Sequence, residues 1–294
     1  MWPQLGVQGE RGLAEVFGLL GMVAYSGEQD FEAAQSLFEQ SLQLYQKHGD
    51  AWGHALSLFR LGTLAVERNE DRTALTLLEQ SMNLFHQLGD SWGKARVSQL
   101  LGQLFLGQGN YERSRSYFEQ NLQLDEALHF KAGIAIALAN LGDLHRYQGD
   151  DEPAQQFYEK GLSMCREYGL KVDEGYNLYS LGMLSLHQEN YLLARQFFTD
   201  YYESNRKLAY KSAIVGLLAG LAAVAAGMNE PERAATLSGA SQGISDGRIP
   251  PFDQSEFDRH IQIARERLGE ERFEVLAAEG RAMSLERAIE FALE

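Results

Sequence analysis

Leu-Gly pairs recur at a spacing of forty residues, and this period constrains the fold more than any other feature of the chain. The pairs stand at Leu61-Gly62, Leu101-Gly102, Leu141-Gly142 and Leu181-Gly182. Two further series keep the same step: small residues at Ala34, Ala74, Ser114, Ala154, Ala194 and Ala234, and bulky ones at Phe38, Leu78, Phe118, Tyr158 and Phe198. Three series with one period indicate stacked copies of one structural unit instead of a single globular core.

Within one period the sequence predicts two helices joined by a turn. Between Gly93 and Gln108 apolar residues return every three or four positions, as on an amphipathic helix. Gly109-Asn110 interrupts this pattern as a helix end would, and the helical period resumes from Tyr111 to Leu128. The recurring Gly of the first helix and Ala or Ser of the second are small. We therefore expect an antiparallel pair with closely spaced backbones.

Two kinds of departure from the period predict local differences. Leu20-Gly21 stands one residue early relative to Ala34, so we expect one extra residue in the turn around Glu28-Gln29. Gly161 and Tyr201 replace the residues that match Ser41 and Ser81, so packing is expected to change there.

The bulk properties exclude some functions. The net charge is −15 and the pI is near 4.9, which is the wrong sign for a surface that displaces counterions from nucleic acid. Cys165 is the only cysteine, so no internal disulfide can form and a reducing compartment is expected. We predict a cytoplasmic protein that does not bind DNA directly.

The stretch from Ser212 to Met228 is a candidate membrane span, because it carries no charge and contains Gly216-x-x-x-Gly220. It is short for that role and rich in Ala and Gly. It also keeps the phase of the repeat, since Ala213 follows Gly53, Gly93 and Gly133 at the same step. A buried helix is the favoured interpretation, with no membrane contact.

Catalysis and metal binding have little support in the sequence. Gly239-x-Ser241-x-Gly243 matches the nucleophile pattern of hydrolases, but that motif requires a preceding strand and a partner histidine. A hydrolase that uses Ser241 is therefore the disfavoured alternative. The histidines show no His-x-x-x-His pair and no cysteine cluster accompanies them, so no metal site is expected. We predict no enzyme activity and no cofactor.

The order Leu-Gly, then Gly-Asn-Tyr seven residues later, then a small residue and Phe resembles the tetratricopeptide repeat (TPR). That repeat usually has 34 residues. The longer unit here, with links such as Gly49-Asp50-Ala51-Trp52-Gly53, is similar to the long-helix variant of bacterial signalling ATPases and cell-polarity scaffolds. The resemblance covers residues 10–245. It implies an all-α, right-handed superhelical solenoid of about six helix pairs, over residues 10–50, 51–90, 91–130, 131–170, 171–210 and 211–246.

The two ends of the chain depart from the repeat. Residues 247–294 are predicted to form a helical cap after a Gly/Pro loop at 247–251, with helices at Gln254–Leu268, Glu270–Glu279 and Leu285–Leu293 and Ser284 as an N-cap. Residues 268–286 resemble the end of bacterial LuxR-type and SARP-type regulators. At the other end, Met1–Gly9 is interpreted as the remainder of a preceding helix. The resemblance implies missing ATPase and effector domains upstream.

The same resemblance implies a binding function. In the family, ligands meet the first helices beside the Leu-Gly pair, on the concave side of the solenoid. The matching residues are Phe59, Thr63, Arg96, Gln99, Gln103, Asn140, Asp143, Arg146, Tyr147, Tyr176, Tyr179, Met183 and His187. Mixed aromatic and hydrogen-bonding side chains suit a protein, a peptide or a small polar effector. The resemblance thus implies the sensor region of a bacterial signalling or transcriptional regulator; the alternative is a free-standing scaffold in complex assembly.

Overall fold

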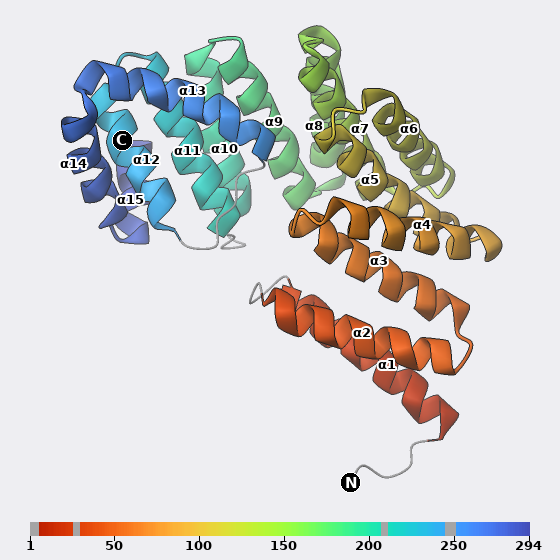
Figure 1. Cartoon of the computed structure of the whole chain (residues 1–294). Helices are drawn as coiled ribbons and strands as arrows, with labels where there is room; N and C mark the ends of the chain where they lie inside the picture. The colour runs from red at the N-terminus through yellow and green to blue at the C-terminus, as the bar shows by residue number, and fades with distance from the viewer. Residues whose placement is uncertain (1–5, 26–29, 207–210, 245–250) are drawn as a thin grey trace. The chain divides into compact units, whose positions relative to one another are not determined.

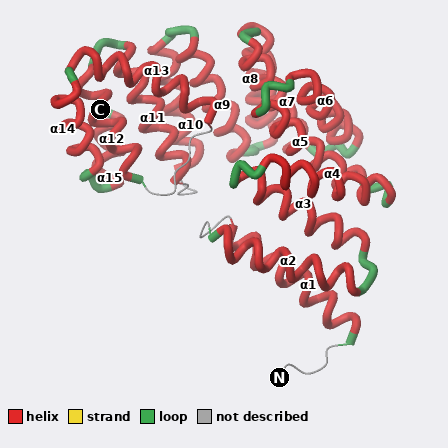
Figure 2. Tube along the Cα trace, viewed as in Figure 1, coloured by secondary structure: helices red, strands yellow, loops and turns green. Residues whose placement is uncertain are grey.

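The computed structural model describes residues 6–25, 30–206, 211–244 and 251–294, and within these ranges it contains helices and no strand (Figure 2). The all-α prediction is thereby confirmed. The chain divides into two compact units, one up to Gly133 (unit 1) and one from Ile134 onward (unit 2). The sequence did not indicate this division. The predicted repeat limits and the boundary between 246 and 247 remain predictions.

The helices follow one another at the spacing that the repeat predicts (Figure 1). Unit 1 contains α1 (Val7–Val23), α2 (Phe31–Lys47), α3 (Ala51–Glu67), α4 (Asp71–Gln87), α5 (Ser91–Gly107), α6 (Tyr111–Ala127) and the first residues of α7 (Lys131–Gln148). Unit 2 contains the rest of α7 and then α8 (Asp151–Tyr168), α9 (Lys171–His187), α10 (Tyr191–Asn205), α11 (Lys211–Gly227), α12 (Pro231–Gly243), α13 (Pro251–Leu268), α14 (Glu270–Arg281) and α15 (Leu285–Leu293).

Two local devices recur in the turns, although α4, α8, α9 and α12 have no side-chain cap. A residue in the left-handed conformation ends the helix, such as Gly109 with φ of 70° or Glu189 with φ of 57°. The residue that follows then caps the next helix: the side chain of Asn110 accepts from the backbone N–H of Arg113, and that of Asp90 accepts from Gly93 at 2.7 Å. Short polar residues at these positions therefore place the start of the second helix.

The recurring glycine faces the bulky residue of its partner helix. A Cβ on Gly62 would lie 2.8 Å from Leu78, and one on Gly182 would lie 2.9 Å from the ring of Phe198. Both Leu78 and Phe198 are fully buried. The small residues of the second helix are buried as well, and Ser114 donates from its hydroxyl to the carbonyl of Gly102 at 2.9 Å. The close helix approach predicted from the Gly and Ala series is present, with the ring packed on the glycine.

The two departures from the period have different outcomes. The hydroxyls of Ser41 and Ser81 donate to the carbonyls of Ala14 and Ala55, each at 2.8 Å. Gly161 has no such hydroxyl, and the space beside it is filled by Asn177. The turn around Glu28-Gln29 and the loop expected from Gly247 onward lie outside the described residues, as 26–29 and 245–250.

The structure corrects the interpretation of both ends. Val7 to Gly9 form the first turn of α1, so these residues are not the remainder of a preceding helix. α13 begins at Pro251, three residues before the predicted start, because Pro is well suited to the first helical position. α14 continues to Arg281, whereas α15 has its predicted limits and Ser284 accepts from the N–H of Arg287.

α11 is a buried helix, as its phase predicts. Ala213, Leu217, Ala222 and Ala226 are all at most 3% exposed, and they contact protein on every side of the helix. Among the helices that the structure describes, none is long and apolar enough to cross a membrane.

The glycine–ring contact predicts a specific instability. Gly102→Ala places a methyl group against the Phe118 ring, so we expect a loss of about 1–3 kcal/mol in the free energy of unfolding. Gly107→Ala is the matched control, because it lies in the same helix and a methyl group there would have no atom of another residue within 4 Å. Urea denaturation followed by circular dichroism measures both. Equal stabilities of the two variants would contradict the packing role of Gly102.

Candidate binding sites

Unit 1 contains a cavity of about 230 Å³ on the side formed by α1, α3 and α5. Its walls are mostly apolar and carry two arginines. The lining residues are Met22, Tyr25, Phe38, Phe59, Arg60, Thr63, Arg96, Gln99 and Leu100. Four predicted residues, Phe59, Thr63, Arg96 and Gln99, are thus brought together, while Gln103, one turn further along α5, does not line the cavity.

Arg60 contributes a cation that feels the charge of Glu15 but forms no ion pair with it. Its guanidinium lies against Gly18, and its central carbon is 5.9 Å from the centre of the Phe38 ring. No carboxylate of the described residues is within ion-pair distance, and burial lowers the pKa of Arg60. A half-buried guanidinium in an apolar wall favours an anionic group of a ligand. Sequence reasoning missed Arg60, although it follows Phe59 directly.

Arg96 is held in place by side chains of α5 and α6. Its guanidinium forms an ion pair with Asp125 of α6 and donates to Oε1 of Gln99 at 3.2 Å. Asp125 is fully buried and also accepts from Asn121 at 2.7 Å; burial raises the pKa of this carboxyl, and Arg96 opposes the shift. The Nε atom of Arg96 is buried and donates to no acceptor. Arg96 therefore brings a fixed positive charge to the cavity wall.

The predicted residues of unit 2 have a different environment. Met183 is 0% exposed and packs in the core with Leu217 and Leu218, and Asn140 is 1% exposed. In this structure these two side chains offer no surface to a ligand, because both are covered by protein. The helical phase that nominated them does not distinguish the outer edge of a helix face from the edge that meets the next helix.

The remaining residues of this set lie in a polar cluster in which Asp143 and Arg146 are buried, while Tyr176 and His187 are exposed. Asp143 of α7 accepts from the hydroxyls of Tyr158 and Tyr176, both at 2.6 Å. Arg146, one turn later, donates from Nε to the Tyr158 oxygen at 3.3 Å. Burial raises the pKa of Asp143, whereas Tyr158, Asp253 and Asp143 hold the pKa of Arg146 above its usual value against the effect of burial. Tyr147 adds its ring, 4.7 Å from the Arg146 guanidinium carbon.

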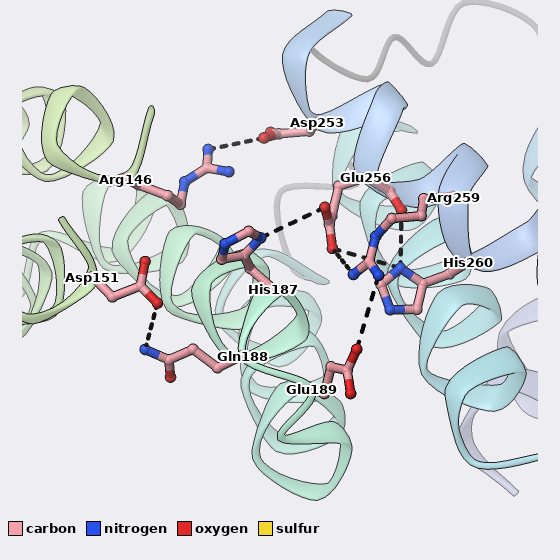
Figure 3. Close-up of polar contacts among 9 residues, drawn as sticks. All are labelled: Arg146, Asp151, His187, Gln188, Glu189, Asp253, Glu256, Arg259 and His260. Carbon is pink, nitrogen blue, oxygen red and sulfur yellow. Dashed lines mark hydrogen bonds and ion pairs between the residues drawn. The ribbon is translucent and has the colours of Figure 1, made fainter. Parts of the chain in front are cut away.

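The first turns of α13 reach this cluster through Asp253 (Figure 3). Oδ1 of Asp253 lies 2.9 Å from the Arg146 guanidinium, and the Asp253 side chain is 3% exposed. One turn later, Glu256 lies 3.7 Å from Nδ1 of His187 on α9. Burial raises the pKa of Tyr179, and the nearby charge of Asp253 raises it further. No acceptor meets the buried Tyr179 hydroxyl with good hydrogen-bond geometry. Sequence reasoning missed Asp253, because 107 residues separate it from Arg146.

His260 is a buried histidine on the same helix. Its Nδ1 lies 2.9 Å from the Glu256 carbonyl oxygen, which can only accept, so Nδ1 carries the proton. Nε2 is buried without a partner. The Glu256 carboxylate is 3.6 Å away, the Tyr191 ring of α10 packs edge-on, and the charges of Arg259 and Glu189 also act on the ring. Burial dominates and lowers the pKa of His260.

Neither Ser241 nor Cys165 lies in surroundings that would activate it as a nucleophile. Ser241 lies in the last turns of α12, and its hydroxyl is 3.5 Å from the carbonyl of Val215. No histidine lines the cavity of about 360 Å³ beside it. Burial raises the pKa of the Cys165 thiol to about 12. Among the residues that the structure describes, no group of three or more His, Cys, Asp or Glu side chains has a metal-binding arrangement.

Comparisons in sequence and structure agree on one fold. The tetratricopeptide repeat model matches residues 12–87 and 94–167, a little over half of the chain. A sequence comparison with curated proteins gives no significant match.

Solved structures extend the similarity over almost the whole chain. A Rap protein complexed with competence and sporulation factor superimposes with a TM-score of 0.67 at 14% identity, over 98% of this chain and 76% of that one. PilF of Pseudomonas aeruginosa gives 0.52 at 14% identity, over 92% and 99%. A signal transduction ATPase with a tetratricopeptide repeat sensor, from Pyrococcus horikoshii, gives 0.56 at 14% identity, over 94% and 47%. At these identities the similarity concerns the fold alone.

The burial of His260 predicts a pH dependence of stability. The unfolded chain takes up a proton near pH 6.5, whereas the folded chain does so only at lower pH. Stability contributed by neutral His260 is therefore present above pH 6.5 and is lost as the pH falls below it. His260→Phe should lose less thermal stability between pH 7.5 and 5.5 than the unaltered chain. His86→Asn, at an exposed site in unit 1, is the control; equal losses in all three would contradict the assignment.

The position of Ser241 in a helix predicts no hydrolase activity. Incubation with p-nitrophenyl acetate should release nitrophenol at the same slow rate from the unaltered chain and from Ser241→Ala. A rate that falls in the variant would restore the hydrolase alternative.

Proposed function

Because the chain belongs to the tetratricopeptide repeat family, we propose that it is a protein-interaction module whose unit 1 cavity binds a segment of a partner protein. The observation that carries the proposal is the combination of apolar walls with Arg60, a half-buried guanidinium that has no ion-pair partner among the described residues. Phe59, Thr63, Arg96 and Gln99 complete the site.

The lining suggests the chemistry of the bound segment. A cavity of about 230 Å³ accommodates one large apolar side chain, and burying such a side chain contributes about 1.5–3 kcal/mol. Arg60 and Arg96 both bring positive charge to the cavity wall. A carboxylate beside the apolar side chain would accept from them, and charge-assisted hydrogen bonds are the stronger kind. The proposed ligand is therefore a peptide segment with an apolar residue next to Asp or Glu.

The same fold supports two roles for such binding. We propose a sensor arm of a bacterial signalling or transcriptional regulator, in which the bound segment biases an attached ATPase between two states. The similarity to the sensor-bearing ATPase of Pyrococcus horikoshii supports this role. The similarity to PilF over nearly its full length equally supports an adaptor in complex assembly. The coding sequence before Met1 separates them: a P-loop ATPase module in the same frame favours the sensor, and its absence favours the adaptor.

The proposal predicts the effect of one charge. Peptides selected from a random display library on the immobilised chain should contain an apolar residue beside Asp or Glu. Arg60→Gln should weaken their binding by about tenfold or more, since hydrogen bonds to charged groups contribute about 1.5–3 kcal/mol. Isothermal titration calorimetry measures the affinity.

Arg72→Gln provides the matched control, because Arg72 is exposed on α4 and does not line the cavity. It should leave the affinity unchanged. Selected peptides that bind the Arg60→Gln chain as tightly as the unaltered chain would contradict the proposed site. So would a selection that recovers no acidic peptides.

A further inference from the structure

α13 is held to unit 2 in two chemically different ways. Its later residues Phe257 and Ala264 are buried among apolar residues of α11 and α12. Its first turns instead reach α7 and α9 through polar side chains: Asp253 forms an ion pair with Arg146, and Glu256 lies 3.7 Å from His187 (Figure 3). The apolar packing of α13 on α11 and α12 therefore does not depend on the contacts of its first turns with α7 and α9.

The receiving site is organised without α13. Tyr158 from α8 and Tyr176 from α9 fix the Asp143 carboxylate, and Tyr158 also accepts from Nε of Arg146. The guanidinium is thus oriented by side chains of three helices that precede α13. The Arg146 side chain is 8% exposed. A carboxylate that reaches it therefore lies in a region of low dielectric constant, where charge-assisted hydrogen bonds are strong.

Asp253 does not use every donor of this site. Oδ1 of Asp253 accepts from Arg146, and Asp253 also lies beside the buried hydroxyl of Tyr179, but without good hydrogen-bond geometry. A buried donor without a well-placed acceptor costs free energy. A second carboxylate that accepts from both groups would hence bind better than Asp253. His187, whose side chain is 52% exposed, marks the accessible edge of the same site.

We propose that the α7–α9 face of unit 2 is a receptor for an acidic helix of a partner protein, and that the first turns of α13 occupy it until the partner displaces them. The partner helix carries two carboxylates three positions apart, as Asp253 and Glu256 do, so that both lie on one helical face. The residues of α13 up to Glu256 have to move, which also breaks the contacts of Glu256 with Arg259 and His260, whereas Phe257 and Ala264 stay packed on α11 and α12. Such local opening requires less free energy than unfolding of the unit.

The test uses the whole chain and a fluorescein-labelled peptide of residues 251–260. Asp253→Asn keeps the volume of the side chain but removes its charge, so the cis contact weakens and the receptor is freed. We expect this variant to bind the peptide at least tenfold more tightly than the unaltered chain, as measured by fluorescence anisotropy. The same peptide with its own Asp253→Asn change should bind at least tenfold more weakly.

Asp258→Asn is the matched control, because Asp258 is an exposed residue of α13 that accepts from Gln254 of the same helix. It should bind the peptide as weakly as the unaltered chain. The peptide also contains Phe-Asp pairs of the kind proposed to bind in unit 1, so every chain in this test, the otherwise unaltered one included, also carries Arg60→Gln. In that background Asp253→Asn should still raise the peptide affinity at least tenfold. Loss of binding in that double variant would place the peptide in unit 1 and overturn the inference.

A second measurement does not depend on the folding of a variant. In the unaltered chain, an excess of the peptide should speed hydrogen exchange of the backbone amides at 254–257 at least threefold and leave those of α12 unchanged. Unchanged exchange at 254–257, or peptide affinity that is the same with and without its carboxylate, would overturn the inference.

Discussion

The contact between a glycine on one helix and a buried ring or Leu on its partner is the constraint on which the repeat depends. It fixes how closely the two helices of a pair approach at Gly62, Gly102, Gly142 and Gly182. Any larger residue there would have to move a fully buried side chain, and well-packed interiors accommodate such changes poorly. The close packing that the glycine permits offsets its unfavourable effect on helix formation, which is about 1 kcal/mol relative to Ala.

The first helices can present side chains because the second helices supply the burial. Phe38, Leu78 and Phe118 are at most 1% exposed, so the interior of each pair is complete without the opposite face of the first helix. In unit 1 that face bears a cavity with Arg60 and Arg96. In unit 2 the equivalent face carries Asp143 and Arg146, and α13 lies over it. One architecture thus provides an open site in one unit and an occupied site in the other.

Buried charge is handled in a similar way in both units. Arg96 and Arg146 each belong to a first helix and each pair with a carboxylate that is at most 3% exposed. Such pairs contribute little net stability, because the cost of removing both charges from water is close to the gain from their attraction. They do restrict geometry, since a guanidinium held by several partners has few alternative positions. The value of these pairs lies in orienting donors at the first-helix face.

The forty-residue period by itself determined the helix pairs, the turns and the burial of α11. These features are local, because they follow from which residues tolerate a close approach, a left-handed turn or a helix start. The period also brought Phe59, Thr63, Arg96 and Gln99 to one cavity. It could not decide that Asn140 and Met183 are covered, or that Asp253 meets Arg146 across 107 residues. The first outcome depends on how α7 and α9 pack against neighbouring helices, and the second on where α13 packs. Both are set by contacts between helices that no local pattern encodes.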